Sequence, residues 1–338
     1  MAKVRMIDVA QKAGVSKSTV SQFLSKRYEF MSEDTRQRIA QAIKELGFQP
    51  NALARSLKMK KTNTVGIIMA NVLHPFSTAV SRGVEDYCQK HGYNVILCNA
   101  DDKPTKERAY IHMLQMKQVD GIIIASTGAN NDVLKQEIDS GFPIVLFDRV
   151  FNDLETDAVY SDNRKGAFMA IEHLIQLGHN RIALIVPEGS LISARTERIQ
   201  GYYEALKAHD IPIDEELVKF LSHSEADLQL DSLWNNENPP TAILTINDLM
   251  TMEVLTYIKK KKIKIPEDVA LIGFDDFPTA HLVEPPLTVV AQPTYEIGVR
   301  SAELLIQHIE NSKSQKYVQQ IFPCQLIIRD SCGFRKKA

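Results

Sequence analysis

The chain has 338 residues, of which 44% are hydrophobic and 24% are charged. This length predicts two or three compact units, and the composition is typical of a globular protein. No apolar run is as long as the roughly 18 residues that a membrane-spanning helix needs. The N-terminal segment also lacks the apolar core of an export signal, so we expect a cytoplasmic protein.

The four cysteines show no metal-binding pattern. Cys88, Cys98, Cys324 and Cys332 lack the close spacing of a C-x-x-C motif. We expect them to be buried free thiols in a reducing compartment, and we expect neither a metal nor a cofactor.

The net charge of −2 hides an asymmetry along the chain. Residues 1–61 carry thirteen Lys and Arg against five Asp and Glu, a net charge of +8. The remaining residues carry 27 basic against 37 acidic side chains, a net charge of −10. A small basic unit joined to a larger acidic one indicates a nucleic-acid-binding head on a body with another task. A basic segment is also often only solvated surface, so the charge alone does not distinguish a nucleic-acid-binding head from an ordinary surface.

The basic segment predicts three short helices. The first lies in MIDVAQKAG and stops at Gly14. The second starts at the cap residue Ser16 and runs to Leu24, and the third runs from Ser32 to just before Gly47. A brief fourth helix is expected in NALARSLK.

From Thr64 onward, short apolar runs alternate with segments of helical spacing. This alternation predicts a parallel sheet covered by helices on both faces. The expected strands are TVGIIMA, YNVILCNA, VDGIIIAS, FPIVLFDR, RIALIVP, TAILTIND and VALIGFDD.

Several of these runs end in polar residues, and ligands of such sheets bind outside the carboxyl ends of the strands. We therefore expect a polar small molecule to bind there, although each residue alone is equally consistent with a cap of the next helix. Arg149 and Arg198 are either surface charges or bidentate donors to a carboxylate or paired hydroxyls. The polar strand ends are Asn71, Asp102, Asp148, Asn247, Asp248, Asp275 and Asp276.

The stretch AGVSKSTVSQFLS has two interpretations. A phosphate loop needs G-x-x-x-x-G-K-[ST] after a strand, but GVSKST lacks the second glycine and follows a helix. A helix, a short turn and a capped helix instead form a helix-turn-helix, whose second helix enters the major groove. Its groove-facing residues would be Lys17, Ser18, Ser21 and Gln22, which otherwise are only an exposed polar face. No dinucleotide-binding, zinc-protease or serine-hydrolase motif occurs, so we expect no enzymatic activity.

The segment IDVAQKAGVSKSTVSQFLS resembles the heads of LacI/GalR-type bacterial regulators. The resemblance continues through KELGFQPNALARSL, SDNRKGAFMAIEHLIQLGHNRIALI, RTERIQGYYEAL and IPEDVALIGFDDF, and covers essentially the whole chain. It implies an α/β chain with a small all-α helix-turn-helix head. The body it implies is periplasmic-binding-protein-like, with two doubly wound parallel-sheet subdomains.

The resemblance also implies a division of the chain. The head, the hinge helix with its linker, and the effector-binding and dimerisation domain would span residues 1–49, 50–61 and 62–338. The N-subdomain of that domain would comprise about 62–161 and 292–322, and the C-subdomain about 162–291 and 323–338.

The function that the resemblance implies is sequence-specific repression of transcription. A homodimer would bind a pseudo-palindromic double-stranded operator, and a small sugar or sugar acid would control its operator affinity. Two alternatives are a sugar-binding protein that serves a transporter and an enzyme built on the doubly wound body. The basic head and the missing export signal argue against the first, and the missing catalytic motif argues against the second.

The family pattern assigns DNA-binding positions to this sequence. Base-reading positions fall on Lys17, Ser18 and Gln22, and phosphate-side positions on Ser16, Thr19 and Ser21. In the hinge, Leu57 matches an apolar wedge in the minor groove. The remaining hinge positions are Asn51, Ala54 and Lys58.

The pattern also implies an effector site at the strand ends. Asp275 matches a carboxylate that holds sugar hydroxyls, and Arg198 and Asn247 match cleft residues. Phe76 either stacks on a sugar ring or packs under the next helix. The other lining positions are His74, Asp148, Arg149 and Gln292.

The sequence departs from the family at several positions. Gln22 stands where arginine is usual, and Ser25 where asparagine is frequent. Glutamine favours adenine whereas arginine favours guanine, so the half-site is expected to differ from those of most relatives. TVSQFLS followed by RYEFM is similar to a subgroup that regulates hexuronate and ketodeoxygluconate use, and an acidic sugar suits a cleft with two arginines.

Overall fold

The computed structural model describes residues 4–49, 61–189, 192–222, 225–311 and 316–333. The chain divides into two compact units, Met1–Thr62 and Asn63–Ala338. The expected fourth helix and the hinge positions lie outside the described residues; these positions are Asn51, Ala54, Leu57 and Lys58. Within the described ranges, no helix is both long and apolar enough to cross a membrane.

Within the described part of the first unit there are three helices, α1 (Met6–Ala13), α2 (Lys17–Leu24) and α3 (Glu33–Leu46). Gly14 ends α1 in the left-handed conformation at φ 64°, where a side chain would be strained. The Ser16 hydroxyl then caps α2 by accepting a hydrogen bond from the backbone of Thr19 at 3.1 Å. The predicted helix-turn-helix is therefore present.

A small apolar core holds these helices together. Val15 and Leu24 are only partly buried and pack against this core. The fully packed members come from all three helices and from the segment after α3; they are Val9, Ala10, Ala13, Val20, Ile39, Ala42 and Phe48.

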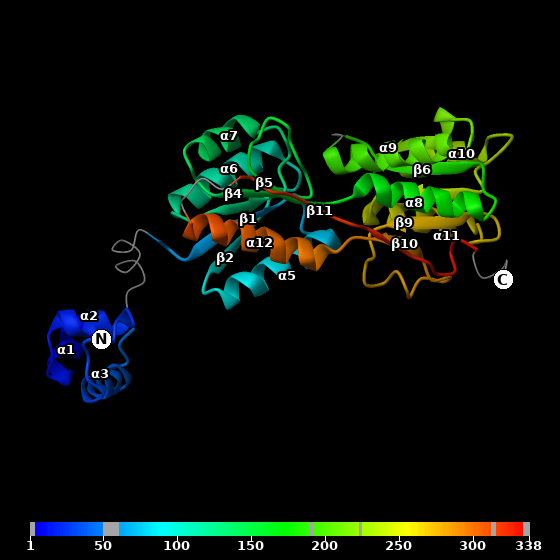
Figure 1. Cartoon of the computed structure of the whole chain (residues 1–338). Helices are drawn as coiled ribbons and strands as arrows, with labels where there is room; N and C mark the ends of the chain where they lie inside the picture. The colour runs from blue at the N-terminus through cyan, green and yellow to red at the C-terminus, as the bar shows by residue number, and fades with distance from the viewer. Residues whose placement is uncertain (1–3, 50–60, 190–191, 223–224, 312–315, 334–338) are drawn as a thin grey trace. The chain divides into compact units, whose positions relative to one another are not determined.

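The second unit contains two six-stranded sheets with helices on both faces of each (Figure 1). The first sheet has the order β11-β5-β4-β3-β1-β2 and is parallel throughout. Its strands are β1 (Thr64–Met69), β2 (Asn94–Asn99), β3 (Ile122–Ile124), β4 (Ile144–Phe147), β5 (Asp157–Ser161) and β11 (Gln319–Phe322). The helices on it are α5 (Pro75–Lys90), α6 (Pro104–Met116), α7 (Asn131–Asp139) and α12 (Thr294–Glu310).

The second sheet has the order β12-β10-β9-β8-β6-β7, and only β12 is antiparallel to its neighbour. Its strands are β6 (Ile182–Pro187), β7 (Val218–Leu221), β8 (Ala242–Thr245), β9 (Ala270–Phe274), β10 (Thr288–Ala291) and β12 (Gln325–Ile327). Its helices are α8 (Asn163–Gln176), α9 (Ser193–Ala208), α10 (Ala226–Trp234) and α11 (Asp248–Lys261), with the short 3-10 turn η1 (Glu215–Leu217) before β7. These two sheets confirm the predicted fold class.

The chain passes from one sheet to the other three times, after β5, after β10 and after β11. All seven strands expected from sequence form, whereas β5, β7, β10, β11 and β12 were not expected from the apolar runs. Three of these, β7, β11 and β12, lie at sheet edges. An edge strand keeps polar residues on its exposed side, so it lacks the continuous apolar run of a central strand.

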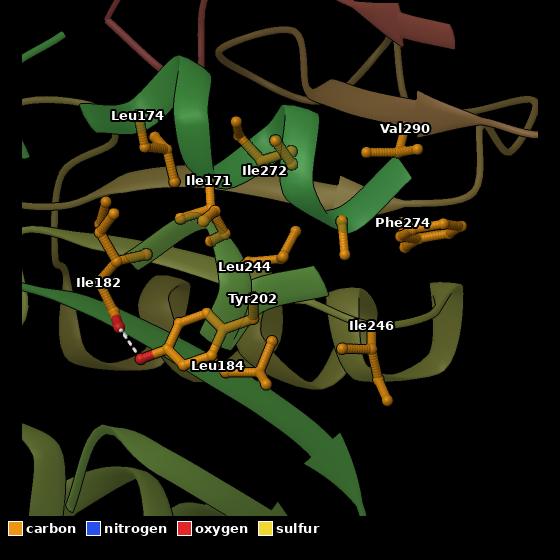
Figure 2. Packing of buried hydrophobic residues seen from close by; sticks show 14 of the residues in the cluster. Ile171, Leu174, Ile182, Leu184, Tyr202, Leu244, Ile246, Ile272, Phe274 and Val290 are labelled. Atoms are coloured by element: carbon orange, nitrogen blue, oxygen red, sulfur yellow. Dashed lines mark hydrogen bonds between the residues drawn. The ribbon is translucent and has the colours of Figure 1, made fainter. Parts of the chain in front are cut away.

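Tyr202 from α9 is fully buried and packs in the core between this helix and the second sheet (Figure 2). Its hydroxyl donates a hydrogen bond to the carbonyl oxygen of Ile182 at 2.9 Å. Leu184 and Leu244 from neighbouring strands pack around the same ring. The buried polar tip is therefore paired, as a phenol in an apolar core must be.

Helices α5 and α12 approach each other closely because glycines lie at their contact. A Cβ atom on Gly298 would lie 2.1 Å from the carbonyl oxygen of Val80, and one on Gly83 would lie 2.3 Å from that of Tyr295. Real side chains do not tolerate such distances from backbone atoms, so the helices fit only with glycine here.

We expect Gly298→Ala to lower the free energy of unfolding by about 2–3 kcal/mol, because overpacking forces the two helices apart. Urea denaturation measures this change. Gln89→Ala, an exposed change on α5, is the control and should cost no more than about 0.5 kcal/mol. Equal midpoints for the two variants would contradict the close-contact argument.

Candidate functional site

The expected base-reading residues lie on the surface of α2. Lys17, Ser18 and Gln22 are exposed, whereas Thr19 and Ser21 are half-buried. These three exposed side chains are therefore available to a partner that approaches α2.

Ser16 has a local structural role at the start of the same helix. Its hydroxyl oxygen lies 2.6 Å from that of Ser18 and 2.8 Å from that of Thr19, in addition to capping the helix. This hydroxyl cluster fixes the first turn of α2. A substitution at Ser16 therefore changes the helix start as well as any phosphate contact.

All eight residues expected at the effector site line one cavity in the second unit, with a volume of about 60 Å³. Six of them lie in segments that directly follow strands of the two sheets, as the carboxyl-end argument requires, whereas Phe76 lies in the first turn of α5 and Arg198 lies in α9. The expected residues are His74, Phe76, Asp148, Arg149, Arg198, Asn247, Asp275 and Gln292. The rest of the lining is Ala70, Ser77, Ala125, Phe147, Ile192, Ala194 and Arg195.

Arg149 follows β4 and is nearly inaccessible to solvent. Its guanidinium donates to Asp102 at 2.7 Å and to the carbonyl oxygen of Ser126 at 3.2 Å. Asp148 lies 3.6 Å from its Nε atom, too far for a hydrogen bond. That Nε–H has no hydrogen-bond partner among the described residues. It is therefore a buried donor left available in the cavity wall.

Arg198 on α9 is held by the second sheet. It donates to the side-chain oxygen of Asn163 at 2.8 Å and to the carbonyl oxygen of Ile246 at 2.5 Å. Its guanidinium carbon lies 3.7 Å from the centre of the Phe274 ring, which is a cation–π contact. Its Nη1 atom also lies 3.9 Å from an Asp275 oxygen. These contacts fix the plane of the guanidinium at the cavity.

Asp275 follows β9 with φ 80°, an unusual conformation for a residue with a side chain. Burial raises the pKa of its carboxyl group, and the positive charge of Arg198 only partly opposes this shift. The side-chain nitrogen of Gln292 donates to the carboxylate at 2.5 Å. The Gln292 oxygen has no hydrogen-bond partner among the described residues, so the cavity also holds an available acceptor.

The second unit has two halves, each built around one of its sheets. His74 and Asp248 connect these halves at the cavity. The His74 Nδ1 atom lies 2.6 Å from an Asp248 oxygen. Burial disfavours the protonated imidazole, but the hydrogen bond and charge of Asp248 outweigh it, so the pKa of His74 lies above its ordinary value. A second link is the backbone N–H of Val150, which donates to the Ser193 hydroxyl at 3.0 Å.

Two expected lining residues also have structural roles. The side-chain oxygen of Asn247 caps α11 by accepting from the backbone of Met250 at 2.8 Å. Phe76 is half-buried and packs against the core of the first sheet while it also lines the cavity. The packing interpretation of Phe76 therefore holds, and stacking on a sugar ring stays a prediction.

Arg195 is the charged lining residue that the sequence interpretation missed. It lies one helical turn before Arg198 on α9, and this three-residue spacing is the signal that would have found it. Burial lowers its pKa, and the positive charges of Arg149 and Arg198 lower it further. Three guanidinium groups thus converge on one small cavity.

Comparison with known proteins identifies the family. The model described as "Periplasmic binding proteins and sugar binding domain of LacI family" matches residues 62–330. The model described as "Bacterial regulatory proteins, lacI family" matches residues 5–51, which contain the helix-turn-helix. The chain belongs to the LacI family.

Individual LacI-family relatives match over nearly the full length. The probable HTH-type transcriptional regulator EndR of Paenibacillus polymyxa is 44% identical over 91% of this chain and 91% of its own. The HTH-type transcriptional regulator KdgR of Bacillus subtilis (strain 168) is 34% identical over 90% of this chain and 91% of its own. A crystal structure of the lac repressor dimer bound to operator and the anti-inducer ONPF matches with a TM-score of 0.84 at 24% identity. The match covers 98% of this chain and 99% of the lac repressor chain.

The LacI-family assignment decides between the functional classes. The chain is a DNA-binding transcriptional regulator with an effector-binding domain, not an enzyme. The alternative of a sugar-binding protein without a DNA-binding role is wrong, because residues 5–51 match the regulatory head of the family. Among the described residues, no group of three His, Cys, Asp or Glu side chains is arranged to hold a metal.

Proposed function

We propose that the chain is a dimeric repressor whose operator affinity is controlled by an acidic sugar bound in the cavity. One observation carries the effector class: three buried or half-buried arginines face a cavity that also contains the carboxylate of Asp275. Arginines bind a carboxylate, and an aspartate accepts from hydroxyl groups. A sugar acid supplies both kinds of group in one small molecule.

Within this site the lining side chains have complementary roles. The Nε–H of Arg149 and the guanidinium of Arg195 are donors for the sugar carboxylate. Asp275 and the side-chain oxygen of Gln292 accept from ring hydroxyls. Phe76 provides an apolar face for the sugar ring. Arg198 holds the carboxylate of Asp275 in place from behind.

The cavity volume makes ligand binding depend on the arrangement of the two halves. A volume of about 60 Å³ has room for about two water molecules, whereas typical small-molecule sites measure roughly 300–1,000 Å³. A sugar therefore enters only if the halves move apart or the lining rearranges. The contacts His74–Asp248 and Val150–Ser193 cross between the halves and must change if the halves move apart.

On the DNA side, we propose that Lys17, Ser18 and Gln22 contact base edges. Ser16, Thr19 and Ser21 would lie near the phosphates, and the hinge positions Asn51, Ala54, Leu57 and Lys58 would enter the minor groove. The lac repressor, which shares the fold, has been solved as a dimer on its operator. The body of this chain exposes several large apolar side chains, which include Leu97, Leu249, Met252 and Leu282.

The test begins with a thermal-shift screen of D-glucuronate and D-galacturonate against D-glucose and D-galactose. A ligand that binds only the native state raises the apparent melting temperature. We expect an acid and not its neutral counterpart to produce the shift. A screen in which neutral sugars stabilise the protein as strongly as the acids would contradict the effector class.

Arg195→Gln is expected to weaken binding of the acidic sugar by about tenfold or more, because a charge-assisted hydrogen bond is lost. Titration calorimetry measures this affinity. Lys165→Gln, an exposed charge on the same half of the body, is the matched control and should leave the affinity within about twofold. The assignment of Arg195 to the carboxylate fails if both variants bind equally well.

A further inference from the structure

Phe30 is an aromatic side chain that is exposed to solvent in the turn that follows α2. It lies in the turn between α2 and α3 with an exposed fraction of 98%, the largest of any large apolar side chain in the described ranges. A single exposed apolar residue on a loose loop would need no explanation. This turn, however, is fixed on both sides of Phe30.

Tyr28 anchors one side of the turn. Its ring packs edge-on against Phe23 of α2, with ring centres 5.9 Å apart, and the Arg36 guanidinium of α3 lies 4.2 Å above its centre. The backbone N–H of Met31 donates to the carbonyl oxygen of Tyr28 at 3.0 Å, and the Met31 side chain packs against the core of the head. Phe30 is therefore turned outward because its neighbours occupy the inward positions.

The turn is also a direct continuation of α2 at its Gln22 end. The backbone N–H of Arg27 donates to the carbonyl oxygen of Gln22 at 3.0 Å, and that of Lys26 to Phe23 at 3.0 Å. The side chains of Lys26 and Arg27 are exposed. Phe30 thus lies in the same short segment as Lys26 and Arg27. This segment follows Gln22, the residue expected to read a base.

This combination points to the chemistry of the partner. Exposed Lys and Arg in a head of net charge +8 favour a polyanion. Among the groups that a DNA groove offers to an apolar side chain, the C5-methyl group of thymine is the one on a base edge in the major groove. A lipid surface or a protein partner would not offer Phe30 such a methyl group next to phosphates that pair with Lys26 and Arg27.

We propose that Phe30 is a sequence-reading residue that packs against the methyl group of a thymine at one edge of each half-site. This inference rests on the proposed function, namely that α2 lies in the major groove of an operator. It adds a contact beyond Lys17, Ser18 and Gln22. It also predicts a preference for a T·A pair at one position next to the bases that α2 reads.

The experiment first selects an operator from a randomised DNA pool with the wild-type protein. Binding is then measured by fluorescence anisotropy at one salt concentration, for wild type and Phe30→Ala. Each thymine near the edge of the half-site is replaced in turn by deoxyuridine, which lacks only the methyl group. At one position we expect the replacement to weaken wild-type binding about fivefold and to leave Phe30→Ala unaffected.

Two controls separate reading from folding. Because Phe30 is almost fully exposed, Phe30→Ala should keep the wild-type melting temperature. Leu228→Ala removes another exposed side chain, 70% accessible and in the second unit, and should change neither operator affinity nor the deoxyuridine effect. Phe30→Leu retains an apolar contact and should recover most of the affinity.

The inference is overturned if Phe30→Ala binds the operator as tightly as wild type. It is also overturned if deoxyuridine weakens both proteins equally at every position, or if Phe30→Ala changes self-association without DNA, measured by sedimentation equilibrium, and not operator binding. These outcomes differ from failure of the proposed function, in which the wild-type protein selects no operator at all.

Discussion

Asp275→Asn is expected to reduce the affinity for the acidic sugar by about 10- to 100-fold, the effect of removing a charged hydrogen-bond acceptor. The carboxylate of Asp275 is buried at the cavity and accepts from Gln292. Asparagine keeps the shape of the side chain but replaces one acceptor oxygen with a donor. Titration calorimetry measures the ligand affinity, and anisotropy measures operator affinity without ligand, which should remain unchanged.

Stability distinguishes this functional loss from a folding defect. Burial raises the pKa of Asp275 in the folded state. A carboxyl with a raised folded pKa favours folding most when protonated, and this contribution is lost as the pH rises through the folded pKa. At neutral pH the raised pKa of Asp275 therefore penalises the folded state, so Asp275→Asn should not lower the melting temperature. Any gain should shrink as the pH falls.

The neighbouring carboxylate supplies the control. Asp276 does not line the cavity and accepts from Arg329 at 2.9 and 3.0 Å. Asp276→Asn should keep the ligand affinity within about twofold, because a partly exposed ion pair contributes little. Equal ligand affinities for wild type and Asp275→Asn would remove Asp275 from the effector site.

The second large effect is a change of base preference in Gln22→Arg. Gln22 is exposed on α2, where its amide is suited to the N6 and N7 edge of adenine, whereas arginine pairs with O6 and N7 of guanine. Such a bidentate pair discriminates by about 1–3 kcal/mol, or roughly 5- to 150-fold. We expect operator selection with the variant to replace one adenine by guanine in each half-site.

An added charge alone must be distinguished from a new base contact. Gln37 is exposed on α3, so Gln37→Arg adds the same charge to the head without changing α2. It should raise affinity for all DNA and steepen the salt dependence, but it should select the wild-type operator. If Gln22→Arg also selects the wild-type operator, Gln22 does not read a base.

The sequence was most informative where one physical constraint dominates. Gly14 and the Ser16 cap predicted the helix-turn-helix, and buried apolar runs predicted the central strands. Three of the polar residues after these strands, Asp148, Asn247 and Asp275, converge on one cavity because parallel strands place their carboxyl ends at one edge. Asp148 and Asp275 therefore line one cavity although 126 intervening residues separate them.

The sequence was least informative where contacts between distant residues determine the role of a side chain or the pairing of a strand. Arg195 resembles a surface charge on α9 until the cavity around it is formed. The link between His74 and Asp248 joins residues 174 positions apart, and no local pattern encodes it. Edge strands such as β12 owe their pairing to a neighbouring strand rather than to their own apolar content.

The central claim is that occupation of the cavity changes operator affinity. The most direct measurement is the operator dissociation constant with and without a saturating concentration of the uronate that stabilises the protein. We predict at least a tenfold change, and the uronate affinity should change by the same factor when operator is saturating, because coupling is reciprocal. A uronate that fills the cavity but leaves operator affinity unchanged would contradict the account.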